Sequence, residues 1–531
     1  MADPLRRRRL GVYYTPDSIA LALTRWALAG GATRVLDPSC GDGRFVRAAG
    51  SELDMENGQN VVVGVDVDGV AIRTLRRDCP PGVRLHLRSF FDVPAAACPD
   101  GPFGAVVGNP PFVRHHWQEP ELLARARERA SEAGAALTGL ADLWAYFTVH
   151  ATQHLSLDGR LALVLPVAAT QVDYAEAVFA FVRRNFARVE LVVLQDRVFE
   201  NAREQLVVLL ASGRGGSTAN VRTAVVASVA DLLARLAGPV AKHGEEADAP
   251  DGVVLWKWHL VSRGARELWT ELCAAPEAEP LGNCAKVRIG TVTGANNLFV
   301  RPADDPVLTS AGVRAHPVVA SSRLLETPVW RNEDDDDAAM KRGGGRLLII
   351  DGAVQPEGRL RTLLDDAEND NVHERHHCAG RKPWWALRDV EVPEAFLGYM
   401  GATPRRLVVN ESGAVCTNAV HRIAWHQGSL HGAAVSSWSS LFRLGAELYG
   451  RHYGGGVLKI EPSAAKRLPV VPNDALGQAL DQLDANLRRR PARGAGLADQ
   501  LVALALGATA RDLKRLAEAA DALATVRRLR R

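Results

Sequence analysis

The sequence has few cysteines, and none of them is placed to bind a metal or to form a disulfide framework. Its seven cysteines are scattered along 531 residues, with no CxxC pair and no spaced Cys/His set. An odd number of separated thiols suits a reducing compartment, so we expect no structural zinc. No apolar run approaches the roughly eighteen residues of a membrane span. The basic segment Arg6–Arg9 is not followed by the apolar stretch of a signal peptide. We expect a cytoplasmic protein without a membrane-bound part.

The chain also lacks a strong charge of either sign. Its formal net charge is +3, with 47% hydrophobic and 24% charged residues, which is an ordinary composition for a folded protein. A polyanionic partner would therefore have to be met by a local basic face rather than by bulk charge. The length is sufficient for roughly two to four domains, each with its own core.

Strand-like and helical segments alternate from Thr33 to about Ser212. This alternation is typical of an open, mostly parallel sheet with helices on both faces, so the sequence predicts a doubly wound α/β fold. We expect helices from 43 to 49, from 68 to 78, and over most of 121–155. The expected strands are 34–36, 61–65, 83–87, 104–108, 159–166, 189–194 and 206–210.

Changes in composition divide the remainder of the chain. The Gly/Ser-rich stretch Ser212–Thr218 and the polar stretch Pro239–Gly252 have the composition of linkers. Beyond them the pattern is irregular and strand-rich, and from about Asn473 it becomes helical and rich in Ala, Leu and Arg. We therefore expect three domains: an α/β domain over 1–240, a mixed α+β domain over 250–472, and a helical extension over 473–531.

A glycine-rich turn follows the first expected strand. The strand ends in Asp37, and Gly41 and Gly43 allow the backbone to approach a ligand closely just before a helix begins. The turn is neither a GxGxxG dinucleotide fingerprint nor a phosphate-binding loop with GKS or GKT. Because its acid is a carboxylate, it favours a cationic or amino-bearing ligand.

The next two strands complete the outline of a nucleoside pocket. Asp66 stands at the tip of the second strand, where an acid can accept both hydroxyl hydrogens of a ribose. After the third strand come Ser89, the aromatic pair beginning at Phe90, and Asp92, and an aromatic ring here can cover an adenine. Each feature alone occurs in many α/β proteins, and an acid at a strand tip can simply cap a helix. The three in this order indicate an adenosine pocket without a polyphosphate.

The fourth strand leads into Asn109, Pro110, Pro111 and Phe112. An exocyclic aromatic amine is a poor nucleophile because its lone pair is delocalised into the ring. If its two N–H groups donate to the Asn109 side-chain oxygen and the Pro110 carbonyl, the lone pair is freed for attack on a methyl group. The two prolines fix the direction of that carbonyl, and Phe112 can stack on the base. Without the pocket before it, this segment would be only a rigid turn.

The order of these motifs resembles a known family. Tyr14-Thr15-Pro16, the turn from Asp37 to Gly41, Asp66, and the Asn-Pro-Pro-Phe turn, followed by a long C-terminal region, are similar to the gamma class of adenine-N6 DNA methyltransferases of restriction-modification systems, in the type II, N-6 DNA methylase family. The resemblance implies a class I S-adenosylmethionine-dependent methyltransferase fold. The residues it implies for the cofactor are Thr15, Pro16, Asp37, Pro38, Cys40, Gly41, Gly43, Asp66, Ser89, Phe90 and Asp92.

The family's roles can be carried over to most of these positions. Thr15 and Pro16 would fold over the methionine part of the cofactor, which Asp37 and Gly41 line from the other side. Asp66 would bind the ribose. Related enzymes often carry an acid before the aromatic residue, but this chain has Ser89, so either its hydroxyl or Asp92 would bind the adenine amine. The family's second stacking aromatic is also missing from the segment Leu209-Leu210-Ala211.

The resemblance implies that residues from about 250 onward read the target DNA sequence. Characteristic segments are Arg288–Phe299, Arg405–Trp425 and Tyr453–Pro462, whose Arg, Asn, His and Trp side chains suit phosphate and base contacts. Any single Arg or His there is as easily an ordinary surface residue. His373, His376, His377 and Cys378 lack a second pair at ligand spacing, so we expect a surface loop rather than a metal site.

The predicted function is methyl transfer from S-adenosylmethionine to adenine N6 at specific sites in double-stranded DNA, with the base flipped out of the helix. The enzyme would act as a monomer in restriction-modification or phage defence, beside a separately encoded restriction endonuclease. Cytosine-N4, RNA or protein amine methylation uses the same turn and stays open. Cytosine-C5 methylation is rejected because the turn has no cysteine. The intact turn argues against a non-catalytic DNA-binding subunit, and no block before Thr15 is large enough for a fused nuclease.

Overall fold

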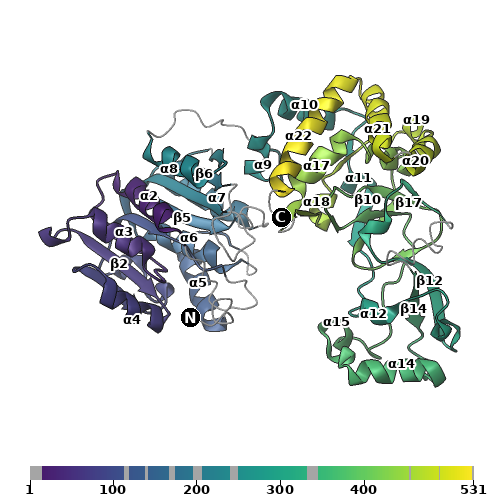
Figure 1. The fold of residues 1–531 in the computed structure, drawn as a ribbon, viewed down its shortest axis with the longest axis horizontal. Coiled ribbons are helices and arrows are strands. Elements are labelled where there is room, and N and C mark those ends of the chain that lie inside the picture. Colours follow the sequence, from purple (N-terminus) through teal and green to yellow (C-terminus); the bar gives the residue numbers. More distant parts are fainter. Residues whose placement is uncertain are drawn as a thin grey trace. The chain divides into compact units, whose positions relative to one another are not determined.

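The computed structural model describes residues 15–112, 119–137, 141–166, 174–194, 206–219, 221–238, 249–331, 345–453, 456–489 and 491–528. The chain divides into two compact units (Figure 1). The first extends to Pro250 and also takes in Val254–His259, whereas the second consists of Asp251–Val253 and the chain from Leu260 to Leu529. The first change of unit, between Pro250 and Asp251, falls inside the stretch 239–252 whose composition predicted a linker, and two further changes flank Val254–His259.

The first unit is built on one eight-stranded sheet. β7 runs antiparallel to both of its neighbours, and the other pairs of adjacent strands are parallel. The doubly wound α/β prediction is therefore confirmed. In spatial order the strands are β3 (Val83–Leu87), β2 (Val61–Asp66), β1 (Arg34–Asp37), β4 (Phe103–Gly108), β5 (Leu155–Pro166), β7 (Leu206–Arg214), β6 (Phe186–Leu194) and β8 (Arg222–Val226).

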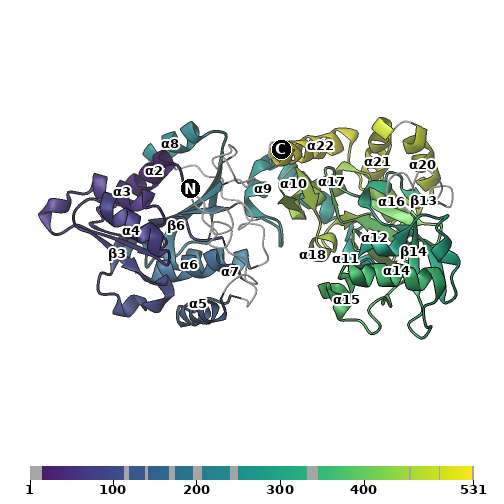
Figure 2. The same cartoon turned by 60° about the horizontal axis from the view of Figure 1, so that its bottom comes forward.

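Helices cover both faces of this sheet. Figure 2 shows α2, α3 and α8 on one side and α5, α6 and α7 on the other. Among the described residues, no helix is long and apolar enough to cross a membrane. The helices of this unit are α2 (Asp17–Leu28), α3 (Arg44–Glu52), α4 (Gly69–Asp78), α5 (Pro120–Glu132), α6 (Leu143–Gln153), α7 (Ala175–Asn185) and α8 (Val229–Ala237), and α9 (Leu255–Leu260) follows the linker.

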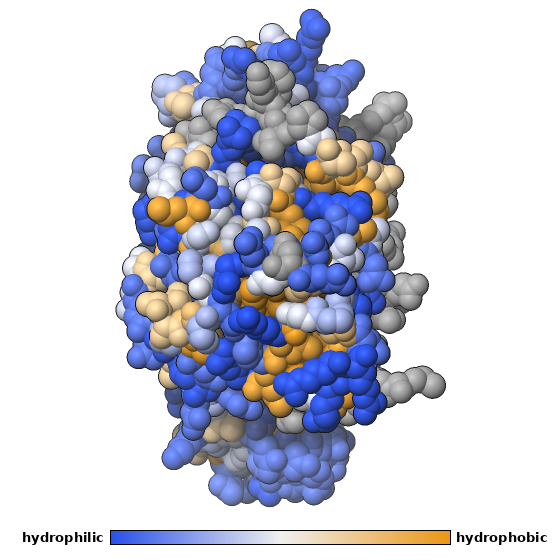
Figure 3. All heavy atoms as spheres, turned by 90° about the vertical axis from the view of Figure 1, so that its left-hand side faces the viewer, coloured by the Kyte–Doolittle hydropathy of each residue, from blue (hydrophilic) through white to orange (hydrophobic). Residues whose placement is uncertain are grey.

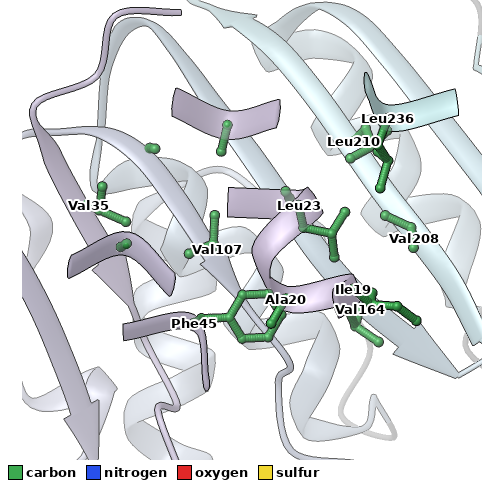
Figure 4. Close-up of a cluster of buried hydrophobic side chains, with 14 of the residues drawn as sticks. Ile19, Ala20, Leu23, Val35, Phe45, Val107, Val164, Val208, Leu210 and Leu236 are labelled. Carbon is green, nitrogen blue, oxygen red and sulfur yellow. The ribbon is translucent and has the colours of Figure 1, made fainter. Parts of the chain in front are cut away.

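Helix α2 anchors the N-terminal part of the site to the sheet. Its buried side chains Ile19 and Leu23, four residues apart on one helix face, pack against strand residues that include Val107 and Val164 (Figure 4). Both are fully buried, and truncating such a leucine to alanine costs about 2–5 kcal/mol. The residues just before α2 are therefore held firmly over the carboxyl ends of the strands.

The boundaries of several elements differ from the predicted ones. The long helix expected over 121–155 is two helices, α5 and α6, and Leu155 already belongs to β5 rather than to a helix. β5 begins at Leu155 rather than at the predicted Gly159, and it contains an irregularity where Asp158 has a φ of 60° and the register with β4 shifts. Ser212–Thr218 is not a linker: β7 continues to Arg214, and β8 and α8 follow in the same unit.

The second unit combines several small sheets with helices. Its five-stranded sheet has the order β10 (Ala285–Ile289), β19 (Val420–Trp425), β15 (Ala395–Gly398), β17 (Leu407–Asn410) and β13 (Val329–Trp330). A four-stranded sheet consists of β11 (Val300–Arg301), β14 (Gly345–Ile350), β12 (Val313–Val319) and β18 (Val415–Cys416). Shorter pairings join β16 (Met400–Gly401), β21 (Val457–Lys459) and β20 (Arg451–Tyr453), and β22 (Pro469–Val470) with β9 (Glu279–Pro280).

The helices around these sheets are α10 (Arg263–Cys273), α11 (Leu281–Cys284), α12 (Asn296–Phe299), α14 (Gly358–Asn369), α15 (His376–Ala379), α16 (Leu430–Ser436), α17 (Ser440–Tyr449), α18 (Pro462–Ala465) and α19 (Asp474–Gly477). The C-terminal helices are α20 (Leu480–Arg489), α21 (Pro491–Ala505) and α22 (Ala510–Arg528). The mixed α+β character predicted for this region is confirmed.

The C-terminal helices are part of the second unit's core. Arg527 of α22 is fully buried and pairs with the fully buried Glu447 of α17, through Nη2 to Oε1 at 2.6 Å and Nε to Oε2 at 3.0 Å. It also donates to the carbonyl of Ala402. The residues from 473 onward, expected as a separate extension, lie within the second unit.

Candidate functional site

Three neighbouring strands bring the predicted site residues to one edge of the large sheet. β2, β1 and β4 are adjacent and parallel, and their carboxyl ends carry Asp66, Asp37 and Asn109 respectively. The carboxyl edge of such a sheet is where ligands bind in doubly wound folds. The structure therefore assembles in space the three motifs that lie far apart in the sequence.

Asp37 is a buried carboxyl at the centre of this edge. It is 2% exposed, and its Oδ1 accepts a hydrogen bond from the Ser39 backbone N–H at 3.2 Å. Burial raises the pKa of Asp37 well above its usual range, and the nearby Asp66 raises it further. β4 runs so close that a Cβ on Gly108 would lie 2.9 Å from Asp37 Oδ1. A cation placed here would stabilise the ionised carboxylate.

The glycine-rich turn leaves room beside the two acids. Gly41 has a φ of 48°, which favours glycine, and no atom lies within 4 Å of the position that its Cβ would occupy. Its backbone N–H donates to Asp66 Oδ2 at 2.7 Å. Pro38 and Cys40 are buried beneath the turn, and Gly43 precedes the first residue of α3. The turn thus forms an open cradle with an acid on either side.

Asp66 is held at the tip of β2 by backbone groups. Its Oδ1 accepts from the Asp68 N–H at 2.8 Å, and burial raises its pKa. The next residue, Val67, is 57% exposed, a side chain to which the sequence gave no role. An exposed valine directly after the acid at a strand tip is a signal that the sequence contained. In the space-filling view, hydrophobic patches likewise interrupt a largely hydrophilic face (Figure 3).

Phe90, which was predicted to cover the adenine of the cofactor, is almost fully buried by other side chains. It is 5% exposed, and its ring centroid lies 4.6 Å from that of His150, 5.0 Å from that of His154 and 5.4 Å from that of Phe147. Burial lowers the pKa of His150 to about 4 and that of His154 to about 3, so both histidines are neutral at physiological pH. The Phe90 ring belongs to a packed aromatic cluster.

Ser89 and Asp92 already have partners in a local cap. The Ser89 hydroxyl accepts from the Phe91 N–H at 3.3 Å, and Asp92 Oδ2 accepts from the Ser89 N–H at 3.1 Å. The other oxygen of Asp92 lies 3.1 Å from Arg125 Nε. Both side chains therefore stabilise the short helical turn Phe90–Asp92.

The Asn109 turn is held from two sides. Its backbone carbonyl accepts from the Ser39 hydroxyl at 3.1 Å, and its side-chain Nδ2 donates to Thr15 Oγ1 at 3.2 Å. Pro110 is buried, whereas Pro111 and Phe112 are half-buried. Ser39 is a residue that the sequence analysis missed, although a hydroxyl between the turn's proline and cysteine is a visible signal.

The segment before α2 also reaches the site. Thr15 is 3% exposed, and its carbonyl accepts from Arg44 Nη1 at 2.8 Å. Pro16 follows as the N-cap of α2. Tyr14, which forms part of the resemblance, lies outside the described residues. The structure therefore brings Thr15 to Asn109, a contact that the predicted role of Thr15 did not include.

The segments predicted to read DNA are spread over the second unit. Lys286 and Arg288 are exposed on β10, where Arg288 stands directly opposite Arg422 of β19. Arg422 contacts Glu391 at 3.3 Å. Like charges opposite each other on adjacent strands are destabilising, and the contact with Glu391 offsets part of the positive charge on this sheet face.

The histidine segment near α15 separates into buried and exposed parts. Cys378 is buried with its Sγ 3.8 Å from the carbonyl of Thr293, while His376 and His377 are exposed. In the part of the chain that the structure describes, no group of three or more His, Cys, Asp or Glu side chains is arranged to hold a metal ion.

Two family models together match most of the chain. Residues 4–209 match the N-6 DNA Methylase family, and residues 254–501 match the C-terminal domain of the Type II methyltransferase M.Eco57I. The first match contains every residue of the site described above, and the second, apart from its first six residues, lies within the unit that carries β10 and β19.

Similar proteins extend along nearly the full length. The Type II methyltransferase M.XamI of Xanthomonas campestris pv. amaranthicola is 25% identical over 479 residues, covering 88% of this chain and 86% of its own. M.AccI of Acinetobacter calcoaceticus is 19% identical over 476 residues, covering 86% and 84%. Among solved structures, the Type IIL restriction-modification enzyme MmeI in complex with DNA has a TM-score of 0.56 at 14% identity, covering 98% of this chain and 77% of that one. At that identity the likeness supports the fold.

Proposed function

Because the chain belongs to the N-6 DNA methylase family of restriction-modification methyltransferases, we propose that it transfers a methyl group from S-adenosylmethionine to N6 of adenine in double-stranded DNA. The observation that carries the proposal is the meeting of Asn109 with two buried or half-buried acids, Asp37 and Asp66, at one sheet edge. An amine-binding turn beside an adenosine pocket is the arrangement that this transfer needs.

The residues at the edge fit the proposed cofactor. Asp37, whose burial disfavours its ionised form, would hold the ammonium group, and the open cradle over Gly41 would take the methionine part. Asp66 would accept the ribose hydroxyls, and the exposed Val67 would lie against the adenine ring. When bound, the cofactor supplies an electrophilic methyl group on a sulfonium.

The Asn109 turn would prepare the nucleophile. The side-chain oxygen of Asn109 and the carbonyl of Pro110 would each accept one N–H of the target amine, which draws the nitrogen lone pair out of the ring. Ser39 holds the Asn109 carbonyl, so the backbone entering Pro110 keeps a fixed direction. Phe112 would stack on the flipped base. A base inside duplex DNA cannot reach this edge without leaving the stack.

The second unit would hold and read the DNA. Its match to the C-terminal domain of a Type II methyltransferase and the exposed cations Lys286 and Arg288 support this assignment. We further propose that the protein acts as a monomer and protects DNA against a separately encoded restriction endonuclease of the same sequence specificity.

The test uses the purified full-length protein, methyl-labelled S-adenosylmethionine and mixed-sequence duplex DNA. Digestion of the DNA to nucleosides should give label in N6-methyladenine. Label in N4-methylcytosine, or only in added RNA or protein, would overturn the assignment. Sequencing of DNA from a host that expresses the chain should show methylated adenines within one short sequence.

A further inference from the structure

Arg44 stands where the local rules for helices disfavour a cation. It is the first residue of α3, and the first turn of this helix contains no acid. The N-terminus of a helix carries a partial positive charge, so a guanidinium there is unfavourable unless other groups of the protein bind it. Exceptions to a local rule are expected at functional sites. The partners of Arg44 therefore indicate what its side chain does.

The guanidinium of Arg44 joins two segments of the site. Its Nε donates to Asp42 Oδ2 at 2.9 Å in the glycine-rich turn, and its Nη1 donates to the Thr15 carbonyl at 2.8 Å, 29 residues earlier in the chain. An arginine side chain can only donate, and a carbonyl or an ionised carboxylate can only accept, so the direction of both bonds is fixed. Hydrogen bonds that involve a charged group are stronger than those between neutral groups.

Thr15 reaches from this connection to the Asn109 turn. Its carbonyl faces Arg44, and its Oγ1 lies 3.2 Å from Asn109 Nδ2. Thr15 is 3% exposed, whereas no atom lies within 4 Å of the position that a Cβ on Gly41 would occupy. The N-terminal segment, Thr15 and Pro16, therefore runs between the glycine-rich turn and the Asn109 turn, at the edge where the cradle is open.

We propose that Arg44 is a positioning residue for cofactor binding, which holds the N-terminal segment beside the open cradle so that a cofactor there is retained. The proposal deepens the function given above and rests on it. Asp37 and Asp66 would contact the cofactor itself, whereas Arg44 acts through the segment that it holds. Its loss weakens the binding of S-adenosylmethionine more than it slows methyl transfer.

The test measures cofactor affinity and methyl transfer separately. Arg44→Met keeps much of the side chain's length and removes its donors. The Kd for S-adenosylmethionine, measured by calorimetry, should rise about tenfold, as expected for the loss of a hydrogen bond to a charged group. At saturating S-adenosylmethionine and duplex DNA, the single-turnover rate should stay within about threefold of wild type. Arg44→Lys keeps a charged donor without the fork, so its Kd should lie between those of the two proteins.

A second readout needs no cofactor. The amides of Ile19 and Ala20 donate to the Pro16 carbonyl at the start of α2. If Arg44 holds the segment before them, these amides should exchange with deuterium about fivefold faster in Arg44→Met than in wild type, while those in the middle of α3 keep their wild-type rate. Equal exchange at the start of α2 in both proteins would overturn the proposal.

Arg25→Met is the matched control. Helices α2 and α3 pack against each other on one side of the sheet (Figure 2), and Arg25 of α2 also contacts α3, through Nη2 to Glu52 Oε1 at 2.9 Å. Glu52 is the last residue of α3, so this pair joins the two helices away from the glycine-rich turn. The Kd of Arg25→Met should equal that of wild type. A rise as large as in Arg44→Met would show that any loosening of the two helices suffices, against the proposal.

Asp42→Asn separates the two bonds of Arg44. It removes the charge of the partner in the turn and leaves the contact with the Thr15 carbonyl, so its Kd for S-adenosylmethionine should rise less than that of Arg44→Met. An equal rise would mean that Arg44 only stabilises the glycine-rich turn, and the role of the N-terminal segment would be refuted.

Failure of the proposed function gives a different result. If the wild-type protein binds no S-adenosylmethionine, the proposed function is wrong and the role of Arg44 in cofactor affinity falls with it. If wild type binds it and the Kd of Arg44→Met is unchanged, only the role of Arg44 is wrong. If Arg44→Met fails to fold, as judged by its thermal midpoint, Arg44→Ala takes its place, and a wild-type Kd in Arg44→Ala would likewise refute the role.

Discussion

The two units of this protein differ in how their polar residues are brought together. In the first unit the polar site residues come from short motifs directly after strands, so sheet topology alone brings Asp37, Asp66 and Asn109 together. In the second unit the exposed cations lie on a sheet assembled from distant strands, with β10 beside β19, which follows it by more than 130 residues. The site in the first unit can therefore be inferred from local sequence, whereas the surface of the second depends on tertiary pairing.

The largest effect should come from removing the side chain at the centre of the first unit's site. Asn109→Ala should lower the single-turnover rate of methyl transfer at least about 100-fold, because the substrate amine loses a hydrogen-bond acceptor that acts in the transition state. Binding of S-adenosylmethionine, followed by calorimetry, should persist. Turnover at the wild-type rate would mean that the chemistry lies elsewhere.

In the second unit the largest expected effect is on stability. Arg527→Met leaves the fully buried Glu447 without its main cation and should destabilise this unit by about 3–5 kcal/mol. Denaturant unfolding with domain-resolved hydrogen exchange would locate the loss. The double variant Arg527→Met/Glu447→Leu should recover much of the stability. Equal protection in wild type and Arg527→Met would show that the Arg527–Glu447 pair contributes little to the stability of this unit.

Asp37→Asn should have opposite effects on cofactor affinity and on stability. A carboxyl whose pKa is raised by folding stabilises the protein at pH values below its unfolded pKa, and this contribution is lost as pH rises through the folded pKa. Near neutral pH the cofactor-free variant should therefore melt about 2–4 °C higher than wild type, and the gap should shrink on acidification. Its affinity for S-adenosylmethionine should fall about tenfold or more.

The pH dependence of binding gives a second check on Asp37. Wild-type affinity for S-adenosylmethionine should increase as pH rises from acidic values and the carboxyl ionises, whereas the affinity of Asp37→Asn should stay flat over that range. Parallel pH profiles in the two proteins would show that another group controls binding.

The smallest effects should come from the two exposed cations on β10. Removing both Lys286 and Arg288 by alanine substitution should weaken duplex binding about tenfold at physiological salt. It should also lower the slope of log affinity against log salt by about two. Lys514→Ala/Arg511→Ala removes two exposed cations from α22 of the same unit and serves as the matched control. An equal loss in both variants would mean that overall charge, rather than this sheet face, attracts DNA.

The parts of the fold that could be predicted from the sequence are those in which a short segment determines its own structure. Buried strands followed by glycine or proline turns identified β1, β2 and β4, and with them the acids and the amide. The single-sequence pattern missed β8 and α8, and it took the end of β7 for a linker because glycine and serine there have the composition of a loop.

The sequence pattern could not predict contacts between residues that lie far apart along the chain. The hydrogen bonds that Thr15 and Ser39 make to Asn109 span 94 and 70 residues, and no periodicity records them. Phe90 was predicted to cover the adenine of the cofactor, and that role stays a prediction. The histidines that enclose its ring, His150 of α6 and His154 at the C-cap of that helix, come about sixty residues later. Burial of a side chain by a distant helix follows from packing, which sequence spacing alone does not determine.

The close approach of β4 to β1 has a consequence for how this enzyme can vary. A methyl group at position 108 would intrude to 2.9 Å from Asp37 Oδ1, so the strand proposed to bind the cofactor and the strand proposed to present the catalytic turn share one small volume. We therefore expect substitutions at positions 37 and 108 to be coupled, because a side chain at position 108 requires the Asp37 carboxyl to shift. Directed evolution that alters cofactor choice should select changes at these two positions as a pair.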